Sequence, residues 1–181
     1  MKNKIEVGEE SVFFGRIRVL GNRNSILIGR NCCYRGDILV IGNDQIVDFG
    51  DYSTTVNVYI LCQEGCNVRI GRHCMLSREI EIRTTDAHSV IDIETGNRLN
   101  TPGDVIIGDH VWVGLGAIVN KGSVIPNDTI VGAGAFVNKP FEEEHTAIAG
   151  APAKVVRRGV TWNRSRRAKF SADEMNEWRT K

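Results

Sequence analysis

The stretch from Ile107 to Glu142, IGDHVWVGLGAIVNKGSVIPNDTIVGAGAFVNKPFE, divides into six consecutive hexads. Gly, Asn or Pro occupies the second position of every hexad. The first position is always aliphatic: Ile107, Val113, Val119, Ile125, Val131 and Val137. A helix would repeat every ~3.6 residues and a strand about every two. A period of six therefore predicts short strands joined by tight turns, three hexads to each triangular coil of a parallel β-helix.

The six-residue register also predicts inward residues upstream, with Asn22 and Glu64 as misfits. Its first positions are Ile28, Tyr34, Val40, Ile46, Tyr52, Val58, Ile70, Leu76 and Ile82. Its fifth positions include Cys32, Ile38, Val56, Cys62, Val68, Cys74 and Ile80, so three cysteines are expected to be small apolar core residues. We predict a β-helix over 25–141. The less regular residues 1–24 are expected to cap its open end.

The register breaks once, because the 25 residues from Ile82 to Ile107 are one more than a multiple of six. This break predicts a loop at about 84–105, and long loops in compact domains usually have a function. His88 lies six residues beyond Ile82, where the next inward aliphatic residue is due. We interpret the loop as the place where the chain presents a chemical group instead of core.

The C-terminal segment, 142–181, differs from the rest of the chain in charge. From Ala151 onward nine basic residues face three acidic ones, 9 − 3 = +6, whereas the whole chain carries +1. A solvated tail and a contact with an anionic ligand or membrane surface both fit this charge. Ser171 and Glu174 form a capping-box pattern that predicts a helix at about 171–180. Met175 and Trp178 are expected to pack on the body.

Composition favours one soluble globular domain. The first residues, MKNKIEVGEE, lack the apolar segment of a secretion signal, and no run of ~18 apolar residues could span a membrane. The five cysteines are odd in number and form no paired Cys-x-x-Cys set, which favours reduced thiols in a cytoplasmic protein.

Several motifs together resemble a known family over about residues 25–160. They are the hexads, DAHS in the loop, GDHVWVG, IVGAGAFVNK and AGAPAKVVR. The combination resembles the left-handed β-helix acyltransferases, and more narrowly the bacterial O-acetyltransferases of capsular polysaccharide, polysialic acid or lipopolysaccharide. The resemblance implies an all-β, left-handed parallel β-helix with one extruded loop and a short C-terminal helix. The handedness comes from the resemblance alone, because parallel crossovers in general favour a right-handed path.

The resemblance also implies an activity: transfer of acetyl from acetyl-CoA to a sugar hydroxyl, without a metal, by a homotrimer with active sites between subunits. His88 matches the family's catalytic histidine, a general base whose ordinary pKa lies near the working pH. A backbone N–H near Gly114 would hold the oxyanion. Asp86 is expected either to orient the imidazole or to hydrogen-bond the loop.

The remaining site residues follow from the same match. Trp112, 24 residues beyond His88, would line the acceptor and acetyl site. Gly114 and Ala133 would line the pantetheine groove, Lys139 and Arg157 would meet the CoA phosphates, and Asn138 departs from the residue types often found there. Ser89, next to His88, and Arg83, before the loop, are candidates for contacts with the acceptor. Arg78, Arg83 and Arg98 surround the loop in sequence, and an anionic sugar would suit them.

Three alternatives stay open. One is N-acetylation of a nucleotide-linked amino sugar, and another is a non-catalytic binding β-helix. The third resembles the γ-type carbonic anhydrases, which need three histidines around zinc; here no two of the histidines 73, 88, 110 and 145 lie five residues apart. His110 is expected to be structural, and His73 and His145 to lie on the surface. The location predicted is the cytoplasm, with contact between the basic tail and the inner membrane face left open.

Overall fold

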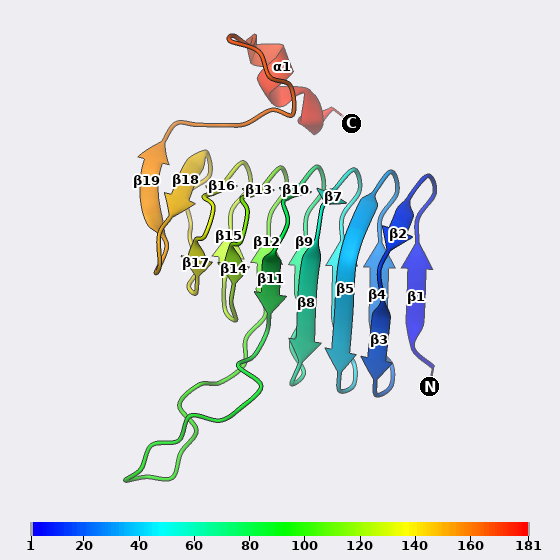
Figure 1. Cartoon of the computed structure of the whole chain (residues 1–181), viewed down its shortest axis with the longest axis vertical. Helices are drawn as coiled ribbons and strands as arrows, with labels where there is room; N and C mark the ends of the chain where they lie inside the picture. The colour runs from blue at the N-terminus through cyan, green and yellow to red at the C-terminus, as the bar shows by residue number, and fades with distance from the viewer. Residues whose placement is uncertain (1, 181) are drawn as a thin grey trace.

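The chain winds into a β-helix with three faces in the computed structural model, which describes residues 2–180 (Figure 1). The first face contains β1 (Lys4–Val7), β4 (Ser25–Ile28), β6 (Ile46–Phe49), β9 (Val68–Ile70), β12 (Val105–Ile107) and β15 (Val124–Ile125). The second contains β2 (Val12–Phe14), β7 (Thr54–Thr55), β10 (Met75–Leu76), β13 (Trp112–Val113), β16 (Ile130–Val131) and β18 (Thr146–Ala149). The third contains β3 (Ile17–Leu20), β8 (Val58–Gln63), β11 (Ile80–Arg83), β14 (Ile118–Val119) and β17 (Phe136–Val137).

Two strands depart from this one-face pattern. The long β5 (Cys33–Ile41) runs from the second face onto the third, pairing with strands of both. The last strand, β19 (Lys154–Arg158), returns antiparallel to β18 and ends the stack. The other strand pairs are parallel, as expected for a coil that repeats itself.

The coils have two lengths. In the downstream half Ile106 pairs with Val124, so that one coil is equal to three hexads. In the upstream half Lys4 pairs with Ser25, and this longer spacing recurs from coil to coil. The upstream coils therefore carry three residues more than three hexads.

Which side chains point inward depends on the length of the coil. The predicted downstream first positions are all buried, and so are Ile28, Tyr34, Val40, Val58, Ile70, Leu76 and Ile82 upstream. Ile46 and Tyr52 are only half-buried and Val56 is 58% exposed, so these three predictions are wrong. Val47 and Phe49 point inward instead. The added residues of the upstream coils shift the count, and a shift by an odd number moves a side chain to the other side of a strand.

Cys32, Cys62 and Cys74 are buried in the stack, which confirms their predicted role as core residues. Each thiol lies near a backbone carbonyl: the Sγ of Cys74 is 3.1 Å from the oxygen of Gly108. Burial raises the pKa of Cys62 and of Cys74 to about 12. These thiols are held in their unreactive, protonated form.

The segment predicted as a cap, 1–24, covers the end of the stack, but it is regular rather than irregular. β1 pairs with β4, and β2 and β3 pair with β5, all in the register of the longer coils. The solenoid therefore already includes residue 4, upstream of the predicted start at residue 25. This first coil covers the next one and leaves its own inner side chains, such as Ile5 and Val7, about half exposed.

The corner between the first and second faces is built from residues in the left-handed backbone conformation. One such residue occurs in each successive coil: Tyr52, His73, His110 and Asp128, with φ values from 52° to 60°. Their N–H groups bond to the carbonyls of the preceding coil, as His110 does to Arg72 at 2.8 Å. The side chains consequently stack along one edge of the prism.

The C-terminal segment crosses this edge. The predicted helix begins as α1 (Ala172–Asn176) and continues as a 3₁₀ turn, η1 (Glu177–Arg179). Its capping box is present: Ser171 Oγ accepts from the N–H of Glu174, and the Glu174 carboxylate accepts from the N–H of Ser171. Trp178 packs on the body as predicted, but Met175 remains 38% exposed. Lys181, the last residue of the basic tail, lies outside the described residues.

Candidate active site

The predicted loop leaves the solenoid where expected, between the end of β11 at Arg83 and the start of β12 at Val105. It departs at the corner between the third and first faces. In the preceding coil this corner carries Glu64, a misfit of the sequence register. The Glu64 carboxylate accepts hydrogen bonds from Thr85, at the start of the loop, and from Arg98, on its returning arm. Arg98 above all, and then Thr85, lower the pKa of Glu64 to about 2.

The loop itself ends in a hairpin. Ile91 and Arg98 pair antiparallel, and the Asp92 carboxylate accepts from the N–H groups of Glu94 and Thr95 to close the turn. The hairpin carries apolar side chains into solvent; Ile93 is 98% exposed. Figure 1 shows the loop extending well clear of the coils, on the side opposite α1.

His88 is exposed near the base of this loop, not in an inward position, because the chain leaves the coil at Thr84. Its backbone is held by Asn100, whose Nδ2 donates to the His88 carbonyl at 2.8 Å and to Asp86 Oδ2 at 2.7 Å. The Nζ of Lys121, from the next coil, donates to the same Asp86 oxygen at 2.6 Å. Lys121 first, and then Asn100, lower the pKa of Asp86.

We call the contacts among Asp86, Asn100 and Lys121 the clasp. They match the second of the two roles expected of Asp86, which is to hydrogen-bond the loop rather than to orient the imidazole. The Asp86 carboxylate hydrogen-bonds the loop, and within residues 2–180 no hydrogen bond joins it to the imidazole of His88. Neither Lys121 nor Asn100 stands out in the sequence. Lys121 occupies an ordinary turn position of a hexad, so only the folded chain reveals its reach to the loop.

The candidates for the acceptor have partners at the loop base. Arg83 donates from Nε to the carbonyl of Thr85 at 3.0 Å and lies 3.3 Å from the carboxylate of Glu81. Arg98 is committed to Glu64, which leaves less of its charge for an anionic sugar. Ser89 is exposed beside His88.

The predicted acetyl-CoA residues lie on other parts of the coils. Trp112 is 38% exposed on the second face. Gly114 follows it, and a Cβ there would come within 2.7 Å of the backbone nitrogen of Ala133, so glycine permits the close approach of two coils. The N–H of Gly114 donates to the carbonyl of Val131 at 2.8 Å. This N–H is therefore not free to hold an oxyanion, and the prediction of a backbone N–H near Gly114 stays a prediction for the neighbouring groups.

The phosphate candidates lie at the downstream end. Asn138 and Lys139 are exposed after β17, with the Lys139 Nζ 5.5 Å from the ring centroid of Phe141. Arg157 is exposed on β19. Among residues 2–180 no hydrogen bond, ion pair or ring contact joins His88 to Trp112 or to these phosphate candidates.

A buried cluster joins the C-terminal segment to the prism edge. The imidazole of His110 is stacked between Trp162 and Trp178, with centroids 4.4 Å and 4.8 Å away, and its Nδ1 lies 2.7 Å from Asp128. Arg179 reaches the other oxygen of Asp128 at 3.1 Å. His110 is thus structural, as predicted.

The other two corner histidines differ in exposure. His145 is exposed, as predicted, but His73 is buried against Tyr52, because the tail covers this edge. Within the described residues, no three His, Cys, Asp or Glu side chains converge as metal ligands do. None of the helices in this part of the chain has the length and apolar character needed to cross a membrane.

Comparison with known proteins identifies relatives, although no family model matches the chain. The polysialic acid O-acetyltransferase of Neisseria meningitidis is 36% identical over 171 residues, covering 82% of this chain and 80% of the relative. The protein of the same name from Escherichia coli O1:K1 is 32% identical over 149 residues, covering 82% of this chain. The chain spans about half, 48%, of that longer relative.

Solved structures agree with these relatives. The polysialic acid O-acetyltransferase OatWY superimposes with a TM-score of 0.85 at 28% identity, covering 98% of this chain and 96% of that one. A hexapeptide-repeat acetyltransferase of Vibrio cholerae, solved with acetyl coenzyme A, shares the fold with a TM-score of 0.53 at 19% identity, covering 84% and 69%. The fold is the left-handed parallel β-helix expected from the resemblance. The chain belongs to the hexapeptide-repeat O-acetyltransferases, the acyltransferase family that includes the polysialic acid O-acetyltransferases.

Proposed function

We propose that this chain transfers an acetyl group from acetyl-CoA to a sugar hydroxyl of a bacterial surface polysaccharide. The relatives named for polysialic acid support a polysaccharide acceptor, and the acetyl-CoA complex of the Vibrio cholerae protein supports the donor. The observation that carries the proposal is the exposed His88 on a loop fastened from two neighbouring coils. A base on a fixed loop can be offered to a large acceptor that cannot enter a closed cavity.

In the proposed reaction His88 takes the proton from the acceptor hydroxyl as that oxygen attacks the thioester carbonyl of acetyl-CoA. A tetrahedral oxyanion forms and collapses, the C–S bond breaks, and CoA leaves as a thiol with the proton returned by the imidazolium. Imidazole suits both transfers because its ordinary pKa lies near neutral pH. Asp86 acts on this base through the loop backbone, so it is a positioning residue.

In this proposal acetyl-CoA, the acetyl donor, binds along the coils. Gly114 and Ala133 line the pantetheine, and Lys139 and Arg157 meet the phosphates, with Asn138 beside them. Trp112 lines the acetyl and acceptor site. Because the Gly114 N–H is engaged in the coil, the oxyanion donor is a different backbone group.

The proposed assembly is a homotrimer with the site between subunits. Its support is that the loop with His88 leaves the corner between the third and first faces, whereas Trp112 lies on the second face. The exposed apolar hairpin, which a neighbouring subunit would cover, also supports it. Arg83 and Ser89 then face the acceptor across this interface. We place the enzyme in the cytoplasm, where acetyl-CoA is made, with the basic tail free to contact an anionic polymer or the inner membrane face.

The test is acetyl transfer to purified capsular polysaccharides, measured as added acetyl mass. His88→Ala is expected to lower turnover by two orders of magnitude or more while acetyl-CoA binding persists, since general bases contribute about 10²–10⁴-fold. His145→Ala is the matched control, because that histidine is also exposed but lies at another corner of the prism, next to β18 and Asp128. Near-normal turnover by His88→Ala would remove His88 as the base.

A further inference from the structure

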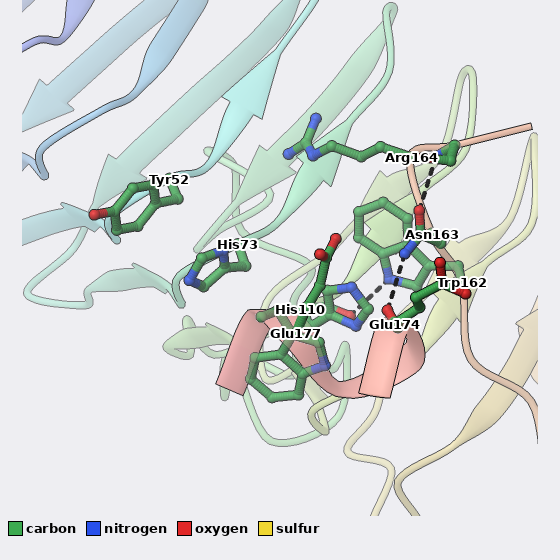
Figure 2. A pocket seen from close by; sticks show the side chains of 10 residues that line it. Tyr52, His73, His110, Trp162, Asn163, Arg164, Glu174 and Glu177 are labelled. Carbon is green, nitrogen blue, oxygen red and sulfur yellow. Dashed lines mark hydrogen bonds between the residues drawn. The ribbon is translucent and has the colours of Figure 1, made fainter. Parts of the chain in front are cut away.

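A pocket opens where the C-terminal segment crosses the prism edge, and neither His88 nor its clasp contributes to it. Figure 2 shows it from close by. Tyr52 and His73 form one wall, stacked in parallel at 4.8 Å. Arg164 approaches from the segment before α1, and Glu177 rises from η1. The pocket exists only because the tail lies over the coils.

Arg164 is the distinctive residue of this pocket. Its Nη1 donates to Thr54 Oγ1 at 2.9 Å and its Nη2 to the carbonyl of Cys74 at 3.0 Å, so the guanidinium is fixed against the second face. It also lies 5.7 Å from the centroid of Trp162. Both hydrogen-bond partners are neutral, and no carboxylate among residues 2–180 forms an ion pair with it. Desolvation by the surrounding protein lowers the pKa of Arg164.

A cation that is partly desolvated and not neutralised favours an anionic ligand. Of the two acids that line the pocket, Glu174 pairs with Arg167 at 2.8 Å and caps α1, and Glu177 has interactions of its own within the protein. Aromatic rings and a guanidinium together suit a sugar ring that carries a carboxylate.

The pocket also lies close to the proposed acetyl site. Trp162, in its lining, is 6.2 Å from Trp112, centroid to centroid. A sugar in the pocket is therefore separated from the reacting sugar by about one aromatic side chain. An acceptor of at least two linked sugars could occupy both positions.

We propose that this pocket is a second acceptor subsite, in which Arg164 binds the carboxylate of a sugar residue other than the one acetylated. The inference rests on the proposed function and deepens it: it assigns to Arg164 the recognition of a second sugar of the acceptor chain. Binding at Arg164 holds the polymer while the reacting hydroxyl meets His88.

The test compares Arg164→Gln with Arg18→Gln, an exposed arginine of the first coil that pairs with no acid among the described residues. Polysialic acid of defined length is titrated against the enzyme without acetyl-CoA, with tryptophan fluorescence as the readout. Arg164→Gln is expected to weaken binding about tenfold, which corresponds to ~1.4 kcal/mol. Arg164→Lys, which keeps the charge but not the two-point hydrogen bonding, should fall between it and wild type. Circular dichroism verifies that each variant is folded.

Steady-state kinetics distinguish a loss of acceptor binding at the subsite from a loss of catalysis. Arg164→Gln should raise the KM for long acceptors about tenfold, leaving kcat, the KM for acetyl-CoA and the KM for one-sugar acceptors unchanged. Wild-type binding by Arg164→Gln, or equally tight binding of neutral dextran by the wild type, would overturn the subsite. Binding of the polymer without acetylation would instead overturn the proposed function and leave the subsite standing.

Discussion

At the scale of single residues, the candidate base depends on groups that the sequence does not single out. His88 can be predicted because it interrupts a register and matches a known motif. What holds it is a carboxylate, an amide and an ammonium contributed by Asp86, Asn100 and Lys121. Asn100 comes from the far end of the loop and Lys121 from the next coil, and only the folding of the loop onto the stack brings them together.

Lys121→Met tests whether the clasp positions the base. Losing the bond to Asp86 should leave the loop less ordered and lower kcat about tenfold, since displacement of a reacting group by ~1 Å can cost on the order of 10²-fold. Global stability should change by less than ~1 kcal/mol, because the Asp86 carboxylate is partly exposed. Turnover and limited proteolysis of the loop are the two measurements.

Arg23→Met is the matched control for Lys121→Met. Arg23 pairs with Asp44 in the same way, but between two upstream coils without a loop. It should keep wild-type kcat and loop protection. If Lys121→Met also kept both, Asp86 and Lys121 would have no positioning role.

Some of these residues can be predicted from the sequence and others cannot, for identifiable reasons. A lone histidine at a register break is a local signal, and so is the Ser171–Glu174 capping box. Arg164 carries no such signal, because its partners Thr54 and Cys74 belong to coils far upstream in the sequence. Contacts made by a tail that folds back on a solenoid leave no periodic trace in the sequence.

At the scale of elements, counting by six finds the inward side chains only in coils whose corners are all short. From Ile107 onward each face and corner together use six residues, so counting by six finds the inward side chains. Upstream, one corner per coil is longer, and the count fails between Val40 and Val58. The loop emerges from this same corner, so it extends a connection that is already longer in the upstream coils.

The prism edge beneath the tail makes a pH-dependent contribution to stability. Asp128 is 1% exposed; desolvation alone would raise its pKa, but hydrogen bonds from His110 and Thr161 and the charges of His110 and His145 lower it overall. Arg179 also faces this carboxylate. Because the pKa is lower in the folded chain, the carboxylate stabilises the fold fully above its unfolded value, near 3.8. This stabilisation is lost as the pH falls through the folded value.

Asp128→Asn should therefore lower the Tm by several degrees at neutral pH, on the order of 1–3 kcal/mol of unfolding free energy. The difference from wild type should shrink as the pH falls below about 4. Thermal unfolding followed by circular dichroism at a series of pH values measures both. Asp173→Asn, an exposed position in α1, is the control and should match wild type throughout. If the Tm of Asp128→Asn stayed below that of wild type by the same amount at acidic pH, the charge of Asp128 would not be the source of the stabilisation.

At the scale of the whole molecule, the two parts of the proposed site lie apart in one chain. The loop with His88 and the tail with the Arg164 pocket lie on opposite sides of the prism (Figure 1). Trp112 is near the tail, as its contact with Trp162 shows. On the proposed function, the base of one subunit would therefore meet the donor site of another. Assembly with copies of itself is the simplest way to unite them.

Ile93→Glu tests this assembly. The side chain is 98% exposed at the tip of the hairpin, where a neighbouring subunit would bury it. A buried, unpaired carboxylate is costly, so the variant should shift from trimer to monomer in light scattering and lose turnover in parallel. Ile5→Glu adds the same charge to the first coil, at a half-exposed site far along the stack from the loop, and should remain trimeric and active. If Ile93→Glu stayed trimeric, the hairpin would not be the contact, and if a monomer kept full turnover, His88 would act without a neighbouring subunit.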